Sequence, residues 1–170
     1  MNAAELAARY DTLALEGCDG AGKSTLAQVL ADDHGFTVVH SPMTPDAISL
    51  TARYTEILDK PGRLILDRCF ISELVYGPLL RDRCRITWPQ ALELVDLVTT
   101  RKGALVHLTA APELIRARLL ARDGEAPQLS ELAALVAAYD KVFRTIASHT
   151  DVLTIRSEPS GTQPHDRESP

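Results

Sequence analysis

Short apolar runs alternate with amphipathic stretches along nearly the whole chain. Five runs have the length and composition of strands, at 12–16, 36–40, 63–67, 104–109 and 152–155. The stretches between them have helical periodicity, at 23–33, 45–58, 71–81, 89–100, 112–121 and 130–147. Strands that alternate with helices in this way are typical of an α/β domain with a mostly parallel sheet.

Turn and cap residues separate these elements. Gly35 and Gly103 stand just before the second and fourth strands, and Pro61 opens a Pro-Gly turn before the third. Thr87 is placed to cap the 89–100 helix, and Ser130 is a weaker candidate cap for the last one.

The length of 170 residues indicates one domain, expected over 1–156, with no internal repeat. Residues 157–170 are mostly Pro, Ser and charged, which predicts a disordered tail. No run approaches the ~20 apolar residues that span a bilayer, so no membrane partner is expected. The first residues lack the basic and apolar regions of a leader, so the expected compartment is the cytoplasm.

The net charge and the cysteine content argue against further classes of protein. A net charge of −5 argues against a nucleic-acid polymer as partner, because such binding needs a basic surface. The three cysteines show no Cys-x-x-Cys spacing, so reduced thiols are expected rather than disulfides or a zinc site. Most of the basic residues are Arg, which suits a small phosphorylated ligand.

The strongest motif is a complete Gly-x-x-x-x-Gly-Lys-Ser at 17–24, between a predicted strand and a predicted helix. Such a loop turns backbone N–H groups toward phosphates, and the helix adds its positive end. Lys23 is expected on the β- and γ-phosphates of ATP, and Ser24 is expected to bind Mg²⁺. The predicted ATP-binding residues are Gly17, Asp19, Gly20, Ala21, Gly22, Lys23, Ser24 and Thr25. The alternative is a glycine-rich turn that binds nothing.

The loop alone does not distinguish GTPases, ATPases and kinases. The chain has no Asn-Lys-x-Asp sequence and no Asp-x-x-Gly after a strand, which argues against a GTPase. It is also too short for the subdomains of a motor-type ATPase. A small kinase remains.

The loop with its acidic Asp19, inside 16–25, resembles that of the thymidylate kinase and deoxynucleoside kinase group. The resemblance implies a three-layer P-loop fold, with a five-stranded parallel sheet of order 2-3-1-4-5 and helices on both faces. In that group the acidic residue contacts the sugar of the acceptor, which assigns this role to Asp19. A solvated loop carboxylate is the alternative.

Asp67 and Arg68, followed by Ser72 and Tyr76, are similar to a second motif of that group. Asp67 would stand at the carboxyl end of a buried strand, where ligands bind in open α/β sheets, and could hold Mg²⁺ through water. Arg68 would clamp an acceptor phosphate or the transferred group. A surface ion pair is the alternative.

The segment from about 116 to 128 resembles the lid of these kinases, whose arginines fold over the phosphates. Arg118 and Arg122 lie four residues apart and share one helix face, so both are predicted catalytic residues, whereas Arg116 faces elsewhere. A solvated arginine face is the alternative reading.

The chain departs from the group at His40-Ser41-Pro42, where thymidylate kinases have Arg-Glu-Pro and nucleoside kinases have a catalytic Glu. A hydroxyl acceptor is helped by a general base, whereas a phosphate acceptor needs none, so the departure favours a monophosphate. The predicted acceptor-binding residues are Asp19, His40, Arg53, Arg68, Phe70 and Tyr76.

The sequence thus predicts an ATP- and Mg²⁺-dependent kinase of a (deoxy)nucleoside monophosphate, with a dTMP-like or modified pyrimidine as acceptor. A small nucleotide is the expected partner, and the resemblance also suggests a homodimer. Two alternatives stay open, namely a kinase of a nucleoside or other small hydroxylated metabolite and a nucleotide-binding module without turnover.

Overall fold

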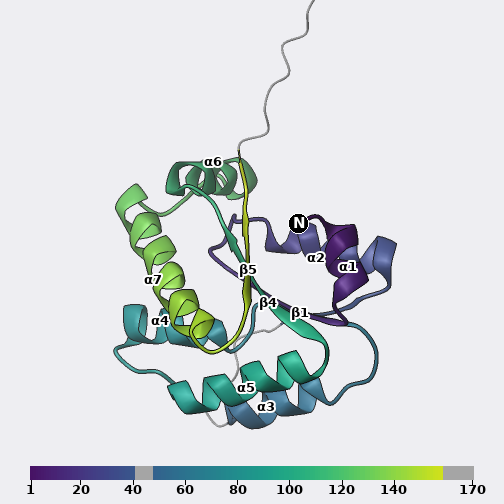
Figure 1. The fold of residues 1–170 in the computed structure, drawn as a ribbon. Coiled ribbons are helices and arrows are strands. Elements are labelled where there is room, and N and C mark those ends of the chain that lie inside the picture. The colour runs from purple at the N-terminus through teal and green to yellow at the C-terminus, as the bar shows by residue number, and fades with distance from the viewer. Residues whose placement is uncertain (41–47, 159–170) are drawn as a thin grey trace, which may run out of the picture.

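A five-stranded parallel sheet of order β2-β3-β1-β4-β5 forms the centre of the fold (Figure 1). It is seen in a computed structural model, in which residues 1–40 and 48–158 are described. The strands are β1 (Thr12–Glu16), β2 (Thr37–His40), β3 (Leu64–Asp67), β4 (Gly103–Thr109) and β5 (Val152–Arg156). The predicted fold class and strand order are confirmed, and every strand end lies within one residue of its predicted position.

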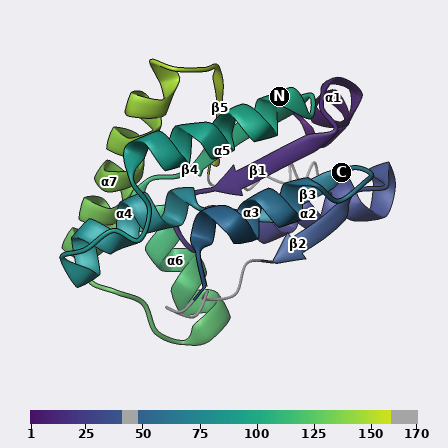
Figure 2. The same cartoon turned by 90° about the horizontal axis from the view of Figure 1, so that it is seen from below.

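Helices cover both faces of this sheet. They are α1 (Ala3–Arg9), α2 (Lys23–His34), α3 (Leu50–Leu58), α4 (Ile71–Arg81), α5 (Trp88–Thr100), α6 (Pro112–Asp123) and α7 (Leu129–Ala147). Helices α1 and α2 pack on one face, and α3, α4, α5 and α7 pack on the other. Helices α3 and α5 lie side by side, as Figure 2 shows. The result is the expected three-layer arrangement.

The central strand β1 is buried at all five positions, as expected for a parallel strand covered on both faces. Its residues alternate, so that Leu13 and Leu15 join the core under α1 and α2 while Ala14 joins the opposite core. From β1 the chain leads to β2 and β3 on one side, and β4 and β5 lie on the other. The carboxyl end of β1 is therefore a topological switch point, where ligands bind in such sheets.

Helix α1 was not predicted from the sequence. It begins with a capping box, in which the Asn2 side chain accepts from the Glu5 N–H and the Glu5 carboxylate accepts from the Asn2 N–H. Leu6 is fully buried, and the Arg63 guanidinium donates to the carbonyl of Tyr10 at 2.9 Å. The first residues therefore belong to the domain, and the capping box was the signal for this helix.

Several helix boundaries also differ from the sequence prediction. The cap of α7 is a capping box of Gln128 and Glu131, so the prediction of Ser130 as its cap is wrong. Helix α3 is described from Leu50 with Ser49 as its cap, and the predicted helical residues 45–47 lie outside the described part. Within residues 1–40 and 48–158, no helix is long and apolar enough to cross a membrane.

Gly17 and Gly35 provide a matched test of close packing behind the glycine-rich loop. Both have positive φ, but a Cβ on Gly17 would lie 1.9 Å from the Leu108 carbonyl oxygen, whereas one on Gly35 meets nothing within 4 Å. We predict that Gly17→Ala lowers the free energy of unfolding by at least about 2 kcal/mol more than Gly35→Ala does. Urea denaturation of both variants measures the difference, and equal losses would contradict the close approach of the loop to β4.

Candidate nucleotide-binding site

The loop at 17–24 lies between β1 and α2, at the switch point of the sheet. Gly22 caps α2 in the left-handed conformation, with φ of 102°, which glycine adopts at little cost. The positive end of α2 therefore faces the loop, an arrangement that favours a bound anion.

Lys23 is buried, with 5% of its surface exposed. Its Nζ donates to the carbonyl oxygens of Gly17 and Cys18, both at 2.8 Å. Burial lowers the pKa of Lys23, and the nearby Arg68 acts in the same direction. The carboxylates of Glu16, Asp19 and Asp67 raise that pKa and so oppose both effects. The carbonyl groups of the loop thus keep the Lys23 ammonium at the position where the phosphates of ATP are expected to bind.

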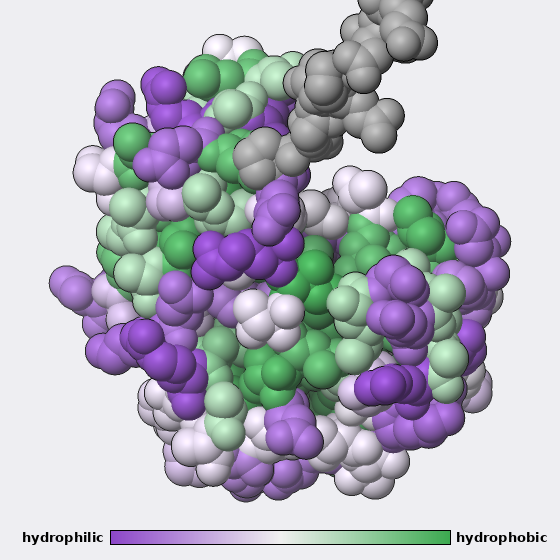
Figure 3. All heavy atoms as spheres, turned by 45° about the horizontal axis from the view of Figure 1, so that its top comes forward, coloured by the Kyte–Doolittle hydropathy of each residue, from purple (hydrophilic) through white to green (hydrophobic). Residues whose placement is uncertain are grey.

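A pocket of about 560 Å³ opens above the loop. Figure 3 shows that the centre of this face is hydrophobic and that more hydrophilic residues border it. Its lining comes from α1, the loop, α2, β4, α6 and the end of β5, namely Met1, Asn2, Ala3, Asp19, Gly20, Ala21, Gly22, Lys23, Ser24, Thr25, Leu26, Val29, Leu108, Arg118, Leu119, Arg122, Ile155 and Ser157. Of the predicted ATP-binding residues, all except Gly17 line this pocket.

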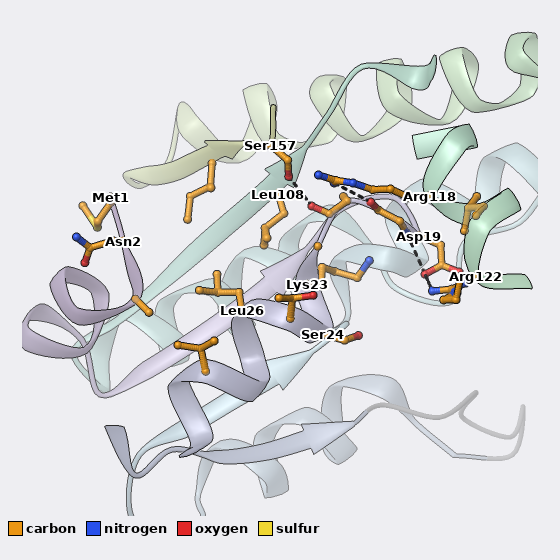
Figure 4. Close-up of a pocket in the computed structure, with 18 residues that line it drawn as sticks. Met1, Asn2, Asp19, Lys23, Ser24, Leu26, Leu108, Arg118, Arg122 and Ser157 are labelled. Carbon is orange, nitrogen blue, oxygen red and sulfur yellow. Dashed lines mark hydrogen bonds and ion pairs between the residues drawn. The ribbon is translucent and has the colours of Figure 1, made fainter. Parts of the chain in front are cut away.

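Asp19 is the centre of an ionic cluster on the loop (Figure 4). Its carboxylate accepts from Arg122 at 2.9 Å and lies 3.6 Å from the Arg68 guanidinium. The hydrogen bond from Arg122 lowers the pKa of Asp19, against the opposing effect of partial burial. Arg118 donates to the Gly20 carbonyl at 3.1 Å, so both arginines of the predicted lid contact the loop from α6.

Asp67 and His40 are paired at the carboxyl ends of β3 and β2. Asp67 Oδ2 lies 3.1 Å from His40 Nδ1, with 10% and 74% of the two side chains exposed. Arg68 follows with a positive φ of 62°, uncommon for a residue with a side chain, and it reaches toward Asp19. Burial raises the pKa of Tyr76 while the charge of Arg68 opposes that rise, so these two side chains are also neighbours.

Glu16, the last residue of β1, is a site residue that the sequence did not single out. It is fully buried, and its carboxylate accepts from the Cys69 N–H at 2.6 Å and from the Ser72 hydroxyl at 2.9 Å. The Tyr139 hydroxyl donates to it at 3.3 Å, and the Tyr139 ring lies edge-on to Tyr76. Its position directly before the glycine-rich loop was the available signal.

Of the six predicted acceptor-binding residues, Asp19 is in the described lining of the loop pocket, and the other five are not, namely His40, Arg53, Arg68, Phe70 and Tyr76. Phe70 is 1% exposed and packs edge-on against Tyr54 in the core, so its ring offers no open face to a base. Arg53 lies on α3 and does not line the pocket. Ser41 and Pro42, which carry the departure from the family motif, lie outside the described residues.

The donor set at the loop fits Mg²⁺ carried by a nucleotide. This ion prefers oxygen ligands and is usually held by one or two protein groups together with phosphates and water. Ser24 offers an exposed hydroxyl in the pocket, and the carboxylate of Asp67 lies close enough to influence the pKa of Lys23. In the described part of the chain, no group of three or more His, Cys, Asp or Glu residues forms a self-sufficient metal site.

Cys18 inside the loop is a packing residue. Burial raises the pKa of its thiol to about 11, although Lys23 opposes this shift. The thiol is therefore protonated at neutral pH and is a poor nucleophile. Cys69 is buried as well, and Cys84 is exposed; all three are free thiols.

Comparison with known proteins gives relatives of the same fold. No protein-family model matches the sequence. An SPbeta prophage-derived uncharacterized protein, YorR of Bacillus subtilis (strain 168), is 27% identical over 139 residues, covering 80% of this chain and 84% of the relative. The solved structure of Bacillus subtilis YorR in complex with phosphorylated GDP has a TM-score of 0.70 at 22% identity, over 86% of this chain and 85% of that one.

Deoxyadenosine kinase from M. mycoides is a second structural neighbour. The structure with bound dATP has a TM-score of 0.53 at 14% identity, over 86% of this chain and 90% of that one. A structure of the same enzyme with the products dCMP and a flexible dCDP has a TM-score of 0.54. The chain thus shares its fold with YorR and with this deoxyadenosine kinase. Its assignment to the thymidylate kinase group stays a prediction.

The Glu16 network gives a test of what holds the site together. Glu16→Gln keeps the shape but turns an amide toward groups that all donate, so we predict a loss of about 2 kcal/mol in the free energy of unfolding. Glu93→Gln, on the exposed face of α5, makes the same charge change and is expected to cost less than about 0.5 kcal/mol. Thermal unfolding compares them, and similar stabilities would show that the network is dispensable.

Proposed function

We propose that this protein is an ATP-dependent kinase that transfers the γ-phosphoryl group of Mg-ATP to a nucleoside monophosphate, with a dTMP-like or modified pyrimidine as the expected acceptor. One observation carries the proposal. Three arginines from two segments, Arg68, Arg118 and Arg122, converge on the loop that already holds the buried Lys23. Such a group of cations suits a phosphoryl group in transfer.

The loop residues are prepared to bind the donor. Lys23 is already desolvated, so it can exchange the two loop carbonyls for phosphate oxygens without a further burial cost. Arg118 and Arg122 would likewise exchange the Gly20 carbonyl and the Asp19 carboxylate for phosphate oxygens. Ser24 directly and Asp67 through water would hold Mg²⁺, which neutralises phosphate charge when bound. Catalysis would consist of positioning and charge stabilisation.

The hydrogen bonds and ion pairs of the carboxylates near Lys23 support a phosphate group as the acceptor. Of the carboxylates that act on Lys23, Glu16 is engaged with Ser72 and Asp67 with His40. Asp19 would be released by Arg122 when ATP binds and would then contact the sugar of the acceptor. A hydroxyl acceptor is helped by a free general base, whereas a phosphate oxygen needs none. Arg68 and Tyr76 would then bind the acceptor phosphate and sugar edge, together with Asp19 and His40.

A second candidate function is phosphorylation of a nucleoside hydroxyl. The fold likeness to a deoxyadenosine kinase favours it, since an enzyme of that name acts on a nucleoside. The two candidates differ in the acceptor and share the same donor site.

An ADP-release assay with Mg-ATP and a panel of nucleosides and nucleoside monophosphates tests the proposal. We predict a strong response to one pyrimidine monophosphate and none in Lys23→Ala, because that variant loses the charge that holds the donor phosphates. Circular dichroism of Lys23→Ala checks that the fold is intact. A response only to nucleosides would favour the second candidate, and silence with every acceptor would contradict both.

The lid arginines give a separate prediction. Arg122→Ala is expected to lower kcat by roughly 10³-fold with a smaller change in the KM for ATP, because an arginine that meets the transferred group acts mainly in the transition state. Arg116→Ala removes the same charge from the same helix, outside the pocket lining, and is expected to keep kcat within about threefold. Steady-state kinetics of both variants decide the matter. An unchanged kcat in Arg122→Ala would remove Arg122 from catalysis.

A further inference from the structure

A second groove, of about 310 Å³, lies between α7 and the strands β4 and β5. Figure 1 shows α7 alongside β5 at this edge of the sheet. The groove wall carries six polar side chains, His107, Thr109, Asp140, Arg144, Thr154 and Arg156. Because contacts between a helix and a sheet are normally apolar, this polar lining needs an explanation.

His107 and Thr109 are the two buried polar residues in the described lining of this groove, each 4% exposed. The His107 ring stacks on Phe143 at a centroid distance of 4.4 Å. His107 Nε2 lies 3.9 Å from Asp140 Oδ1, a distance too long for a hydrogen bond. Among the described residues, the buried side-chain atom without a hydrogen-bond partner is Arg63 Nε and not a His107 nitrogen, so the His107 nitrogens are open to water in the groove. A ligand group can replace that water.

The imidazole of His107 is suited to a neutral hydrogen bond. Burial lowers its pKa, Arg156 acts in the same direction, and Asp140 opposes both. At neutral pH the ring is therefore uncharged, with one N–H donor and one nitrogen acceptor.

Two arginines stand at the two walls of the groove. Arg144 comes from α7 and Arg156 from β5; both are exposed, and neither has a hydrogen bond or ion pair to its side chain within the described residues. Asp140 is the single acidic residue in the described lining, so the groove carries a net positive charge when His107 is neutral. Guanidinium groups are planar forks that match phosphate and carboxylate oxygens.

We propose that this groove is a second ligand site, which binds a small phosphate- or carboxylate-bearing molecule between Arg144 and Arg156, with a polar group of that molecule hydrogen-bonded to His107. The volume of about 310 Å³ is near the lower end of small-molecule pockets, which suits a compact metabolite.

This site is distinct from the nucleotide pocket. The two share no lining residue. Leu108 and Ile155 line the nucleotide pocket, whereas their chain neighbours His107 and Arg156 line the groove. Because successive strand residues point to opposite faces, the two sites lie on opposite sides of the sheet. The site therefore does not depend on the proposed kinase activity.

Nuclear magnetic resonance of the His107 ring nitrogens tests the site in the full chain. Inorganic phosphate and succinate are the two probes, and His107→Asn assigns the signals. We expect a saturable shift of the His107 signals with at least one probe. The double variant Arg144→Gln/Arg156→Gln is expected to weaken that binding about tenfold or more, since it removes the charge-assisted hydrogen bonds.

Two controls make the titration specific. Lys141→Gln removes an exposed charge from α7 outside the groove and is expected to leave the affinity unchanged. Lys23→Ala weakens anion binding at the phosphate loop and is expected to leave the His107 shift in place. A response to phosphate alone identifies a phosphorylated ligand, and one to succinate alone identifies a carboxylate. No saturable shift with either probe, or equal affinity in the double arginine variant, would overturn the site.

Discussion

The buried carboxylate of Glu16 is the constraint on which the rest of the site depends. A charge taken out of water is costly unless several hydrogen bonds replace its hydration. Here the donors are the Cys69 N–H just before α4, the N–H and hydroxyl of Ser72 in its first turn, and the Tyr139 hydroxyl from α7. Satisfying one carboxylate therefore fixes two helices against the end of β1, and the loop that follows β1 begins from a rigid position.

The ionic contacts of the loop differ from this network in their exposure. Arg122 and Asp19 are 55% and 48% exposed, and pairs of this kind contribute little to stability. The Arg122–Asp19 contact can therefore be exchanged for a contact with a ligand at a small cost in free energy. The hydrogen bonds to the buried Glu16 carboxylate cannot be exchanged in this way. Lys23 is intermediate, because its charge is buried but its partners are backbone carbonyls of the same loop. The Glu16 network is thus a rigid support for the site, whereas the cations Arg122 and Lys23 can exchange their present partners for a ligand.

The sequence predicted the strands because buried parallel strands are short apolar runs, and it predicted the loop because its glycines, Lys23 and Ser24 have fixed spacing. It did not reveal the role of Glu16, whose partners lie 53 to 123 residues away in the chain. Such pairings depend on tertiary packing, which periodicity does not encode. Phe70 was predicted to bind the acceptor, yet the turn into α4 places its ring in the core.

The sheet edge at β4 and β5 gives the two pockets a common wall. Tyr139, which binds Glu16, is adjacent in the chain to Asp140 in the groove. Ser157, whose hydroxyl donates to the Ala21 carbonyl of the loop at 2.9 Å, directly follows Arg156. Both residues are held by β4, since Arg156 is paired with Thr109 and the Ser157 N–H donates to the Thr109 carbonyl at 2.8 Å. Any coupling between the two pockets would act equally in both directions, because linkage of binding free energies is reciprocal.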